Sequence, residues 1–282
     1  MENIRLLIVD GSNLLFQMFY GMPARILGKN GKPIQGVLGF VGALGKMIQM
    51  VTPSHIAVLF DGECHNERKD LDPCYKANRP DFSQIPEEDT PFSQLPDIFR
   101  ALKRMKIPYA ETTCCEADDW IAGYARKYGD SIEVVIASQD SDFFQLITEN
   151  VRILRYRGQS SLLCDRDYIQ EKFGILPEQY ADFKALVGDS ADNIRGADKI
   201  GPKTAAALLQ QFGTLENSLE RTDQVQKPSV RTSLENNAQR LRSNQKLICL
   251  WGARDLPFDL REIAYGQHCE TTMQILKGLH IL

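Results

Sequence analysis

Carboxylates in five short segments are the residues of this chain whose types and spacing could do chemistry. The nine acids are Asp10; Asp61; Glu116, Asp118 and Asp119; Asp140 and Asp142; and Asp189 and Asp192. Residues two apart in an extended segment point to the same side, and residues three apart in a helix share one face. Each segment alone has a plainer interpretation, because an Asp-Gly pair is typical of a turn and acids at a helix start cap that helix. The hypothesis of a shared site therefore depends on their convergence.

A shared site of this kind would need counter-ions. Two carboxylates in contact already raise one pKa strongly, and a larger gathering cannot stay ionised unless cations lie among the acids. Oxygen ligands without His or Cys favour magnesium or manganese over zinc. The local chemistry therefore predicts two or more divalent ions and, with them, a phosphate substrate.

Three apolar runs that end at these acids indicate how the chain would gather them. Ile4–Val9 precedes Asp10, Ile56–Phe60 precedes Asp61, and Val134–Ala137 precedes the fourth acidic segment. Short apolar runs suit strands that are buried on both faces. Helical patterns separate the runs, at Val37–Val51, Phe92–Met105 and Asp118–Tyr128. This alternation predicts an α/β fold with a mostly parallel central sheet and helices on both faces, which binds ligands beyond the carboxyl ends of its strands.

The segment from about residue 73 to residue 96 has a different composition. It holds five of the thirteen prolines, so we expect a long, mobile excursion from the sheet rather than part of the core. A solvated surface loop is the default interpretation of such a segment. The basic and aromatic residues at its start, Tyr75, Lys76 and Arg79, argue for a functional one.

After about residue 179 the pattern becomes helical. Two short helices flank residues 188–193 and a turn at 199–204, and the second helix, Lys203–Phe212, ends at Gly213. Residues 199–248 hold eight basic and four acidic side chains, a net charge of +4. Such a segment suits a polyanionic partner.

Composition narrows the class of protein. The net charge is −4, from 33 basic and 37 acidic residues; without the nine clustered acids, 28 acids remain and the balance becomes +5. The 282 residues suffice for one or two globular domains, and no apolar run reaches the length that a bilayer needs. The N-terminus lacks the pattern of a secretion signal. Seven cysteines without a C-x-x-C pair indicate reduced thiols, so we expect a cytoplasmic protein without zinc or a disulfide framework.

With these residues in view, the chain resembles the 5′-nuclease (flap endonuclease) family. It is similar to the N-terminal 5′→3′ exonuclease domain of bacterial DNA polymerase I, in the family's free-standing form. The resemblance covers roughly Leu6 to Leu250. Its motifs are VDGSNL (9–14), FDG (60–62), YKANRP (75–80), EADD (116–119), SQDSDFFQL (138–146), GDSADNI (188–194) and IGPKTAAALL (200–209).

This resemblance implies an architecture. It consists of a PIN-like nuclease core at residues 1–178, with a helical arch at about 73–96. A helical DNA-binding region at 179–282 follows, with a helix-three-turn-helix motif at about 183–212. The resemblance also implies two or more magnesium or manganese ions, a potassium ion at the helix-three-turn-helix, and a monomer.

Residue roles follow from the same resemblance. Acids around a first ion match Asp10, Asp61, Glu116 and Asp118. Acids around a second ion match Asp142, Asp189 and Asp192, with Asp119 and Asp140 between or behind them. Arch residues with catalytic roles match Lys76, Arg79 and Tyr75, the last placed to stack on a base. DNA-binding positions match Arg68, Lys199, Gly201, Lys203 and Thr204.

The sequence departs from the family pattern in two places. Glu63 and His65 stand where basic residues are usual, which puts part of the grip on a 5′ strand in doubt. Lys199 replaces a usual glycine, and Arg195 stands where a proline is common. These two changes would weaken a backbone-built potassium site or add a phosphate contact.

The function implied is a structure-specific 5′→3′ exonuclease and flap endonuclease. Its substrates would be flapped or nicked DNA and RNA primers on DNA, in replication and repair. Two alternatives remain: an RNA-directed nuclease of the PIN type, and a DNA-binding protein whose site is catalytically silent. The positive helical segment argues against the first, and the full set of nine acids argues against the second.

Overall fold

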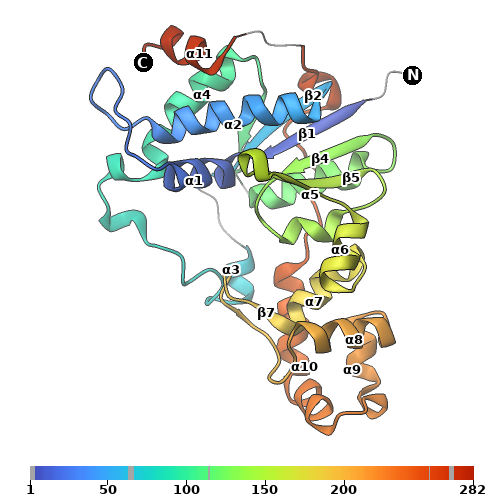
Figure 1. Cartoon of the computed structure of the whole chain (residues 1–282). Helices are drawn as coiled ribbons and strands as arrows, with labels where there is room; N and C mark the ends of the chain where they lie inside the picture. The colour runs from blue at the N-terminus through green and yellow to red at the C-terminus, as the bar shows by residue number, and fades with distance from the viewer. Residues whose placement is uncertain (1–3, 63–66, 114, 254, 267–269) are drawn as a thin grey trace.

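A six-stranded sheet lies at the centre of the computed structural model, which describes residues 4–62, 67–113, 115–253, 255–266 and 270–282 (Figure 1). The strand order is β3-β2-β1-β4-β5-β6. The strands are β1 Arg5–Asp10, β2 His55–Phe60, β3 Tyr109–Glu111, β4 Glu133–Ala137, β5 Val151–Arg155 and β6 Leu162–Cys164. All neighbours are parallel except β5 and β6. The predicted mostly parallel α/β sheet is confirmed, and the three predicted runs form β1, β2 and β4.

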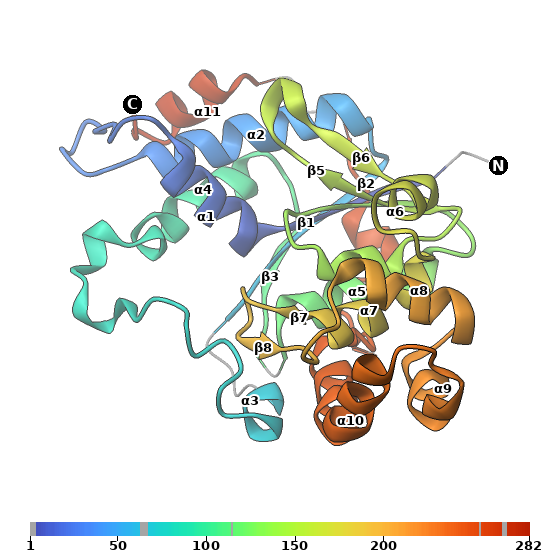
Figure 2. The same ribbon diagram turned by 60° about the horizontal axis from the view of Figure 1, so that its bottom comes forward.

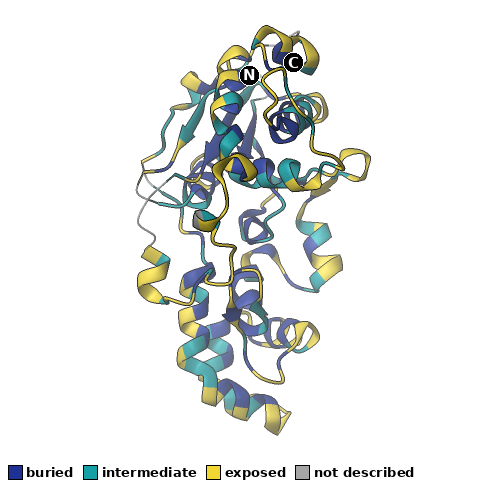
Figure 3. Cartoon of the chain, turned by 90° about the vertical axis from the view of Figure 1, so that its left-hand side faces the viewer, coloured by how far each residue is buried: buried dark blue, intermediate teal, exposed yellow. Residues whose placement is uncertain are grey.

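The sheet is covered on both faces because its strands are apolar throughout. Along β1, Leu6 and Ile8 pack into one hydrophobic cluster, and Leu7 and Val9 pack into another; all four are fully buried. The helices that cover the face of Leu7 and Val9 are α1 Gly11–Gly21, α2 Gln35–Val51, α4 Leu95–Arg104 and α11 Thr272–Gly278. The helices that cover the face of Leu6 and Ile8 include α5 Ala117–Tyr128 and α6 Arg166–Phe173. In Figure 3 the buried residues concentrate between these layers.

A second group of helices lies at the end of the molecule away from α2 and α11 (Figure 1). It comprises α7 Tyr180–Val187, α8 Pro202–Phe212, α9 Leu215–Glu220 and α10 Pro228–Ile248, with a short hairpin of β7 Gly188–Asp189 and β8 Ile194–Arg195 between α7 and α8. After α10 the chain returns to the sheet, where Ala264 forms an antiparallel bridge with His55. No helix of the described residues is both long and apolar enough to cross a membrane.

The segment between β2 and α4 leaves the sheet, as the sequence predicts. It contains α3 Glu67–Leu71 and the 3₁₀ turns η1 Phe82–Gln84, η2 Glu87–Asp89 and η3 Pro91–Gln94. Figure 2 shows it as an open strap along one side of the molecule. Aromatic rings fix its far end, because Phe16 of α1 lies 5.8 Å from Phe82 and 5.6 Å from Phe92, measured between ring centroids.

One predicted helix begins later than expected. The pattern predicts a helix from residue 92, whereas Phe92 lies in η3 and α4 begins at Leu95. Pro96 occupies the first turn of α4, where a missing N–H costs nothing, so it suits the start of this helix and not its interior.

Candidate metal centre

Three strand ends bring acids to one edge of the sheet. Asp10 is the last residue of β1, Asp61 follows β2, and Asp140 follows β4 shortly after its end. Because β2, β1 and β4 are adjacent and parallel, these carboxylates meet. The Ala117 backbone N–H donates to Asp61 Oδ1 over 2.9 Å, which ties the start of α5 to this edge and adds Asp118. We call Asp10, Asp61, Asp118 and Asp140 the strand-end cluster.

Local turns orient the members of the strand-end cluster. Asp10 caps α1, because its Oδ1 accepts from the Asn13 backbone N–H over 2.9 Å, and its Oδ2 accepts from Ser138 Oγ over 2.8 Å. Asp140 Oδ1 accepts from the Asp142 backbone N–H over 2.8 Å. Asp10, Asp61 and Asp140 are therefore held in place by neutral donors, which do not compensate their negative charge.

The charges within the strand-end cluster repel one another. Burial, together with the charges of Asp61 and Asp140, raises the pKa of Asp10 to about 7. Burial and the neighbouring Asp140 likewise raise the pKa of Asp118, although Lys76 acts in the opposite direction. The described residues give the Asp118 carboxylate no hydrogen bond and no ion pair. An oxygen-only group of this kind suits a hard divalent cation.

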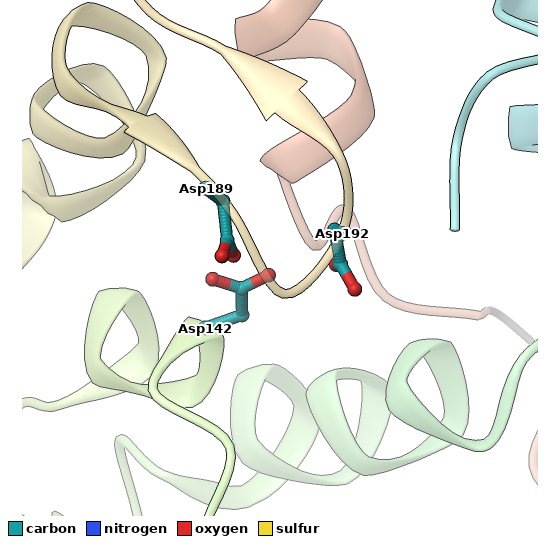
Figure 4. Close-up of side chains that lie close together, drawn as sticks. All are labelled: Asp142, Asp189 and Asp192. Carbon is teal, nitrogen blue, oxygen red and sulfur yellow. The ribbon is translucent and has the colours of Figure 1, made fainter. Parts of the chain in front are cut away.

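A second acidic group lies where the β7–β8 hairpin meets the 3₁₀ turn η4 Asp142–Leu146. One carboxylate oxygen from each of Asp142, Asp189 and Asp192 lies within 4.8 Å of the others. Asp142 and Asp189 point toward each other in Figure 4. We call these three residues the hairpin group. Their separation suits ligands of one cation.

A buried lysine, which the sequence analysis missed, contacts the hairpin group. Lys184 of α7 forms ion pairs with both Asp142 and Asp189. Burial opposes the charged form of Lys184, but these two carboxylates outweigh it and raise the lysine pKa. The same ammonium lowers the pKa of Asp189 against the effect of burial. The signal in the sequence is a lysine five residues before Asp189, inside the otherwise largely apolar helix YADFKALV, whose only other charged residue is Asp182.

The two remaining acids pair with basic residues of the excursion. Lys76 Nζ lies 2.7 Å from Glu116 Oε1, and Arg68 Nη1 lies 2.6 Å from Glu116 Oε2. Arg68 also reaches Asp119 over 2.8 Å. Burial opposes ionisation of Glu116, but Lys76 and Arg68 hold its pKa below the usual range. Glu116 and Asp119 are thus compensated by the protein itself.

The excursion is also attached to the β7–β8 hairpin. Arg79 Nη2 lies 3.0 Å from Asp192 Oδ1, and the Lys76 backbone N–H donates to the Asp192 carbonyl over 3.0 Å. Asn78 Nδ2 donates to the Ser190 carbonyl over 2.8 Å. The start of the excursion therefore lies against the hairpin group. Figure 2 shows the chain that follows α3 running close to β8.

The environment of Tyr75 differs from the one expected from the sequence, in which its ring would stack on a base. Stacking on a base requires an exposed ring face, but Tyr75 is only 4% exposed and belongs to the hydrophobic core. Lys76 Nζ lies over the ring, 4.8 Å from its centroid. The apolar ring gains more from burial here than from solvent exposure, so in this conformation no base can stack on it.

The predicted DNA-binding residues of the helical region lie apart from the acids, around the start of α8. Gly201 is the N-cap of α8, and Lys203 and Thr204 belong to its first turn. Lys199 adopts a left-handed conformation with φ of 65°, which is the conformation that a glycine adopts most easily. The backbone of the turn thus keeps the left-handed conformation usual for glycine, although residue 199 is a lysine.

Some residues singled out in the sequence cannot be compared. Glu63, Cys64, His65 and Cys114 lie outside the described residues. Of the cysteines within them, Cys74, Cys164 and Cys249 carry free thiols.

The strand-end cluster leads to a prediction about pH. The folded state holds protons on Asp10 and Asp118 that the unfolded chain, with an ordinary Asp pKa of 3.8, releases. Their contribution to the free energy of unfolding is complete below about pH 4 and is lost as the pH rises, which for Asp10 happens through about pH 7. We expect urea unfolding in a chelator to show this loss, on the order of a few kcal/mol, and added Mg²⁺ to abolish it because the ion replaces the protons.

Asp10→Asn is the control for this prediction, since it removes one of the titrating groups. Its unfolding free energy in a chelator should vary less with pH than that of the native protein. Equal pH dependence with and without Mg²⁺ would contradict the expected exchange of protons for metal.

Comparison with known proteins places this arrangement in a family. The family models for the 5′-3′ exonuclease N-terminal resolvase-like domain and C-terminal SAM fold match residues 5–174 and 175–271. The chain is 33% identical to the 5′-3′ exonuclease of Aquifex aeolicus over 258 residues, which covers 91% of this chain and 84% of that protein. It is 38% identical to DNA polymerase I of Rhizobium leguminosarum over 263 residues, but these are 90% of this chain and only 25% of the polymerase.

A solved structure is similar to this chain over most of its length. The 5′-exonuclease of bacteriophage T5, with bound divalent metal ions (zinc), superimposes with a TM-score of 0.71 at 25% identity, covering 86% of this chain and 89% of that one. Fold, acidic edge and sequence all agree, and the chain belongs to the 5′-3′ exonuclease family.

Proposed function

We propose that this protein hydrolyses phosphodiester bonds near the 5′ end of flapped, nicked or primer-bearing DNA, using two magnesium ions. The observation that carries the proposal is the strand-end cluster, whose four converging carboxylates form no ion pair among the described residues and lie beside a second group of three acids. A relative described as a flap endonuclease of bacteriophage T5 is solved with DNA and metal ions, which supports this choice of substrate and cofactor.

The two acidic groups would have separate tasks. The strand-end cluster would hold the first ion, with Asp140 in place of Glu116 among its ligands, because Glu116 faces Lys76 and Arg68. The hairpin group would hold the second ion. When bound, such ions supply an activated water and stabilise the departing oxygen.

Basic residues of the excursion would act on the same phosphate. Lys76 lies between Glu116 and Asp118, so its ammonium is held beside the place where the reacting phosphate would bind. There it would stabilise negative charge that develops in the transition state. Arg79, half-exposed beside the hairpin group, would grip the 5′ strand. Passage of that strand along the excursion would select substrates with a free 5′ end.

Duplex binding would fall to the region after residue 178. Residues 199–248 carry a net charge of +4, and the exposed start of α8 directs backbone N–H groups outward. We infer that α7, the hairpin and α8 act as a helix-three-turn-helix that binds phosphates and, at its turn, a potassium ion. The glycine-like path at Lys199 favours retention of that turn.

Cleavage of matched substrates tests the proposal. A 5′-labelled flap on a duplex should be cut near its junction in Mg²⁺, whereas the same flap blocked at its 5′ end by a bulky protein should be cut slowly. A flap made of RNA separates the proposed function from an RNA-directed nuclease, which would prefer RNA without a duplex. Binding without cleavage at any Mg²⁺ or Mn²⁺ concentration would identify a silent DNA-binding protein instead. Sedimentation of the protein with DNA tests the expected monomer.

A further inference from the structure

Lys184 occupies an unusual position for a lysine. Its side chain is 9% exposed, and its ammonium lies between two carboxylates of the hairpin group, Asp142 and Asp189. An unpaired ammonium at this depth would be strongly disfavoured, so the two acids stabilise its charge. The third acid, Asp192, pairs with Arg79 instead. Each acid of the hairpin group therefore already has a cationic partner from the chain.

The strand-end cluster provides the contrast within the same molecule. Asp10 and Asp118 form no ion pair among the described residues, and burial together with the charges of neighbouring acids raises their pKa values. The two acidic groups thus differ in their ion pairs: each acid of the hairpin group pairs with a basic side chain, whereas the strand-end cluster forms no ion pair among the described residues. A divalent ion entering the strand-end cluster displaces only protons, whereas one entering the hairpin group meets the Lys184 ammonium among its ligands.

A bound ion and the Lys184 ammonium would compete for the same carboxylates of the hairpin group. The carboxylate oxygens of its three acids lie within 4.8 Å of one another, which is a separation suited to one central ion. A lysine ammonium is a compact point charge on a flexible four-carbon stem, so it can withdraw without movement of its helix. Lys184 projects from α7, and α7 is held by buried residues on its other faces, among them Phe183 and Leu186.

We propose that Lys184 is a displaceable internal counter-ion that holds the hairpin group together without metal and weakens its affinity for the second ion. This inference rests on the proposed two-ion function. It assigns the two ions a binding order, with the strand-end cluster filled first and the hairpin group filled only when the Lys184 ammonium moves away.

Mn²⁺ binding to three proteins tests the proposal without reference to cleavage. Electron paramagnetic resonance and calorimetry count bound ions and give two dissociation constants for the native chain, Lys184→Met and Lys184→Arg. In Lys184→Met the second ion should bind at least about tenfold more tightly, roughly 1.4 kcal/mol, with the first constant unchanged. In Lys184→Arg it should bind more weakly than in the native chain, because a guanidinium holds carboxylates through two hydrogen bonds. Lys103→Met, an exposed position on α4, is the matched control for loss of one lysine charge.

The two substitutions separate the counter-ion from a merely structural lysine. A structural role would lower second-ion affinity in both variants, and that result overturns the proposal. Unchanged binding in Lys184→Met, with two ions bound by the native chain, also overturns it while leaving the two-ion function intact. If every protein, native and variant, binds a single ion, the two-ion function fails as well. Should Lys184→Met not fold, as judged by circular dichroism, Lys184→Gln takes its place, because its amide can still donate to Asp142 and Asp189 without carrying a charge. Tighter binding of the second ion in Lys184→Gln supports the proposal, and native-like or weaker binding refutes it.

Discussion

Asp140→Asn is expected to abolish cleavage of a 5′-flapped DNA in Mg²⁺, with a loss of at least about a thousandfold in turnover. The carboxylate lies in the strand-end cluster, where its charge acts on both Asp10 and Asp118. Loss of one negative ligand removes several kcal/mol of the charge stabilisation that a bound ion gives the transition state. Asparagine keeps the oxygen that accepts from the Asp142 backbone N–H, so the local fold should persist. Single-turnover cleavage of a labelled flap measures the effect.

Binding of the same flap in a Ca²⁺ buffer should be nearly unchanged in Asp140→Asn, because the duplex would be held by the helical region. Asp130→Asn, at an exposed position after α5, controls for loss of one acidic charge and should cleave normally. Full activity of Asp140→Asn would remove Asp140 from the proposed metal site.

Lys76→Met is expected to lower turnover on the order of a hundredfold while changing DNA affinity little. The ammonium is buried against Glu116 and is also attracted by Asp118, and these contacts hold it charged at the edge where the phosphate would bind. Removal of one preorganised positive donor typically costs this much in turnover. Single-turnover rates at saturating enzyme separate the chemical step from binding.

Lys69→Met, an exposed neighbour on α3, is the control for this second change. Lys76→Arg keeps the positive charge but replaces the compact ammonium by a planar guanidinium, so we expect a rate between those of the native protein and Lys76→Met. A rate for Lys76→Met equal to that of the native protein would exclude the lysine from the chemistry. A large loss of affinity with an unchanged rate would instead make it a binding residue.

The structure confirms that the acids of β1, β2 and β4 converge, but the counter-ions of the nine acids differ from those expected from the sequence. From the sequence, metal ions were the expected counter-ions for all nine acids. Four basic side chains share that task, namely Arg68, Lys76, Arg79 and Lys184. The strand-end cluster forms no ion pair among the described residues, and burial together with mutual repulsion raises the pKa values of Asp10 and Asp118. Burial also raises the pKa of Asp142 despite Lys184, whereas basic partners lower the pKa values of Glu116 and Asp189.

Several elements could not be predicted from local pattern. Helix α1 begins directly after Asp10, and the sequence analysis assigned no helix there. The strands β3 and β6 have three residues each, too few to show a period. β3 is stabilised by pairing with β2, which lies far from it in the sequence, whereas β6 pairs with the preceding strand β5 across a short loop. Tertiary contacts therefore decide where such short segments become strands.

By itself the sequence determined the core of this protein. Its apolar runs became β1, β2 and β4, since a run buried on both faces has few other stable conformations, and acids at the ends of adjacent parallel strands must converge. Only the tertiary structure decided which acids keep an uncompensated charge. Lys76 and Glu116 are 40 residues apart and Arg79 and Asp192 are 113 apart, so no local spacing records these pairs. Such contacts form only when the excursion, α5 and the β7–β8 hairpin have packed together, and their energies depend on burial that a single segment cannot provide.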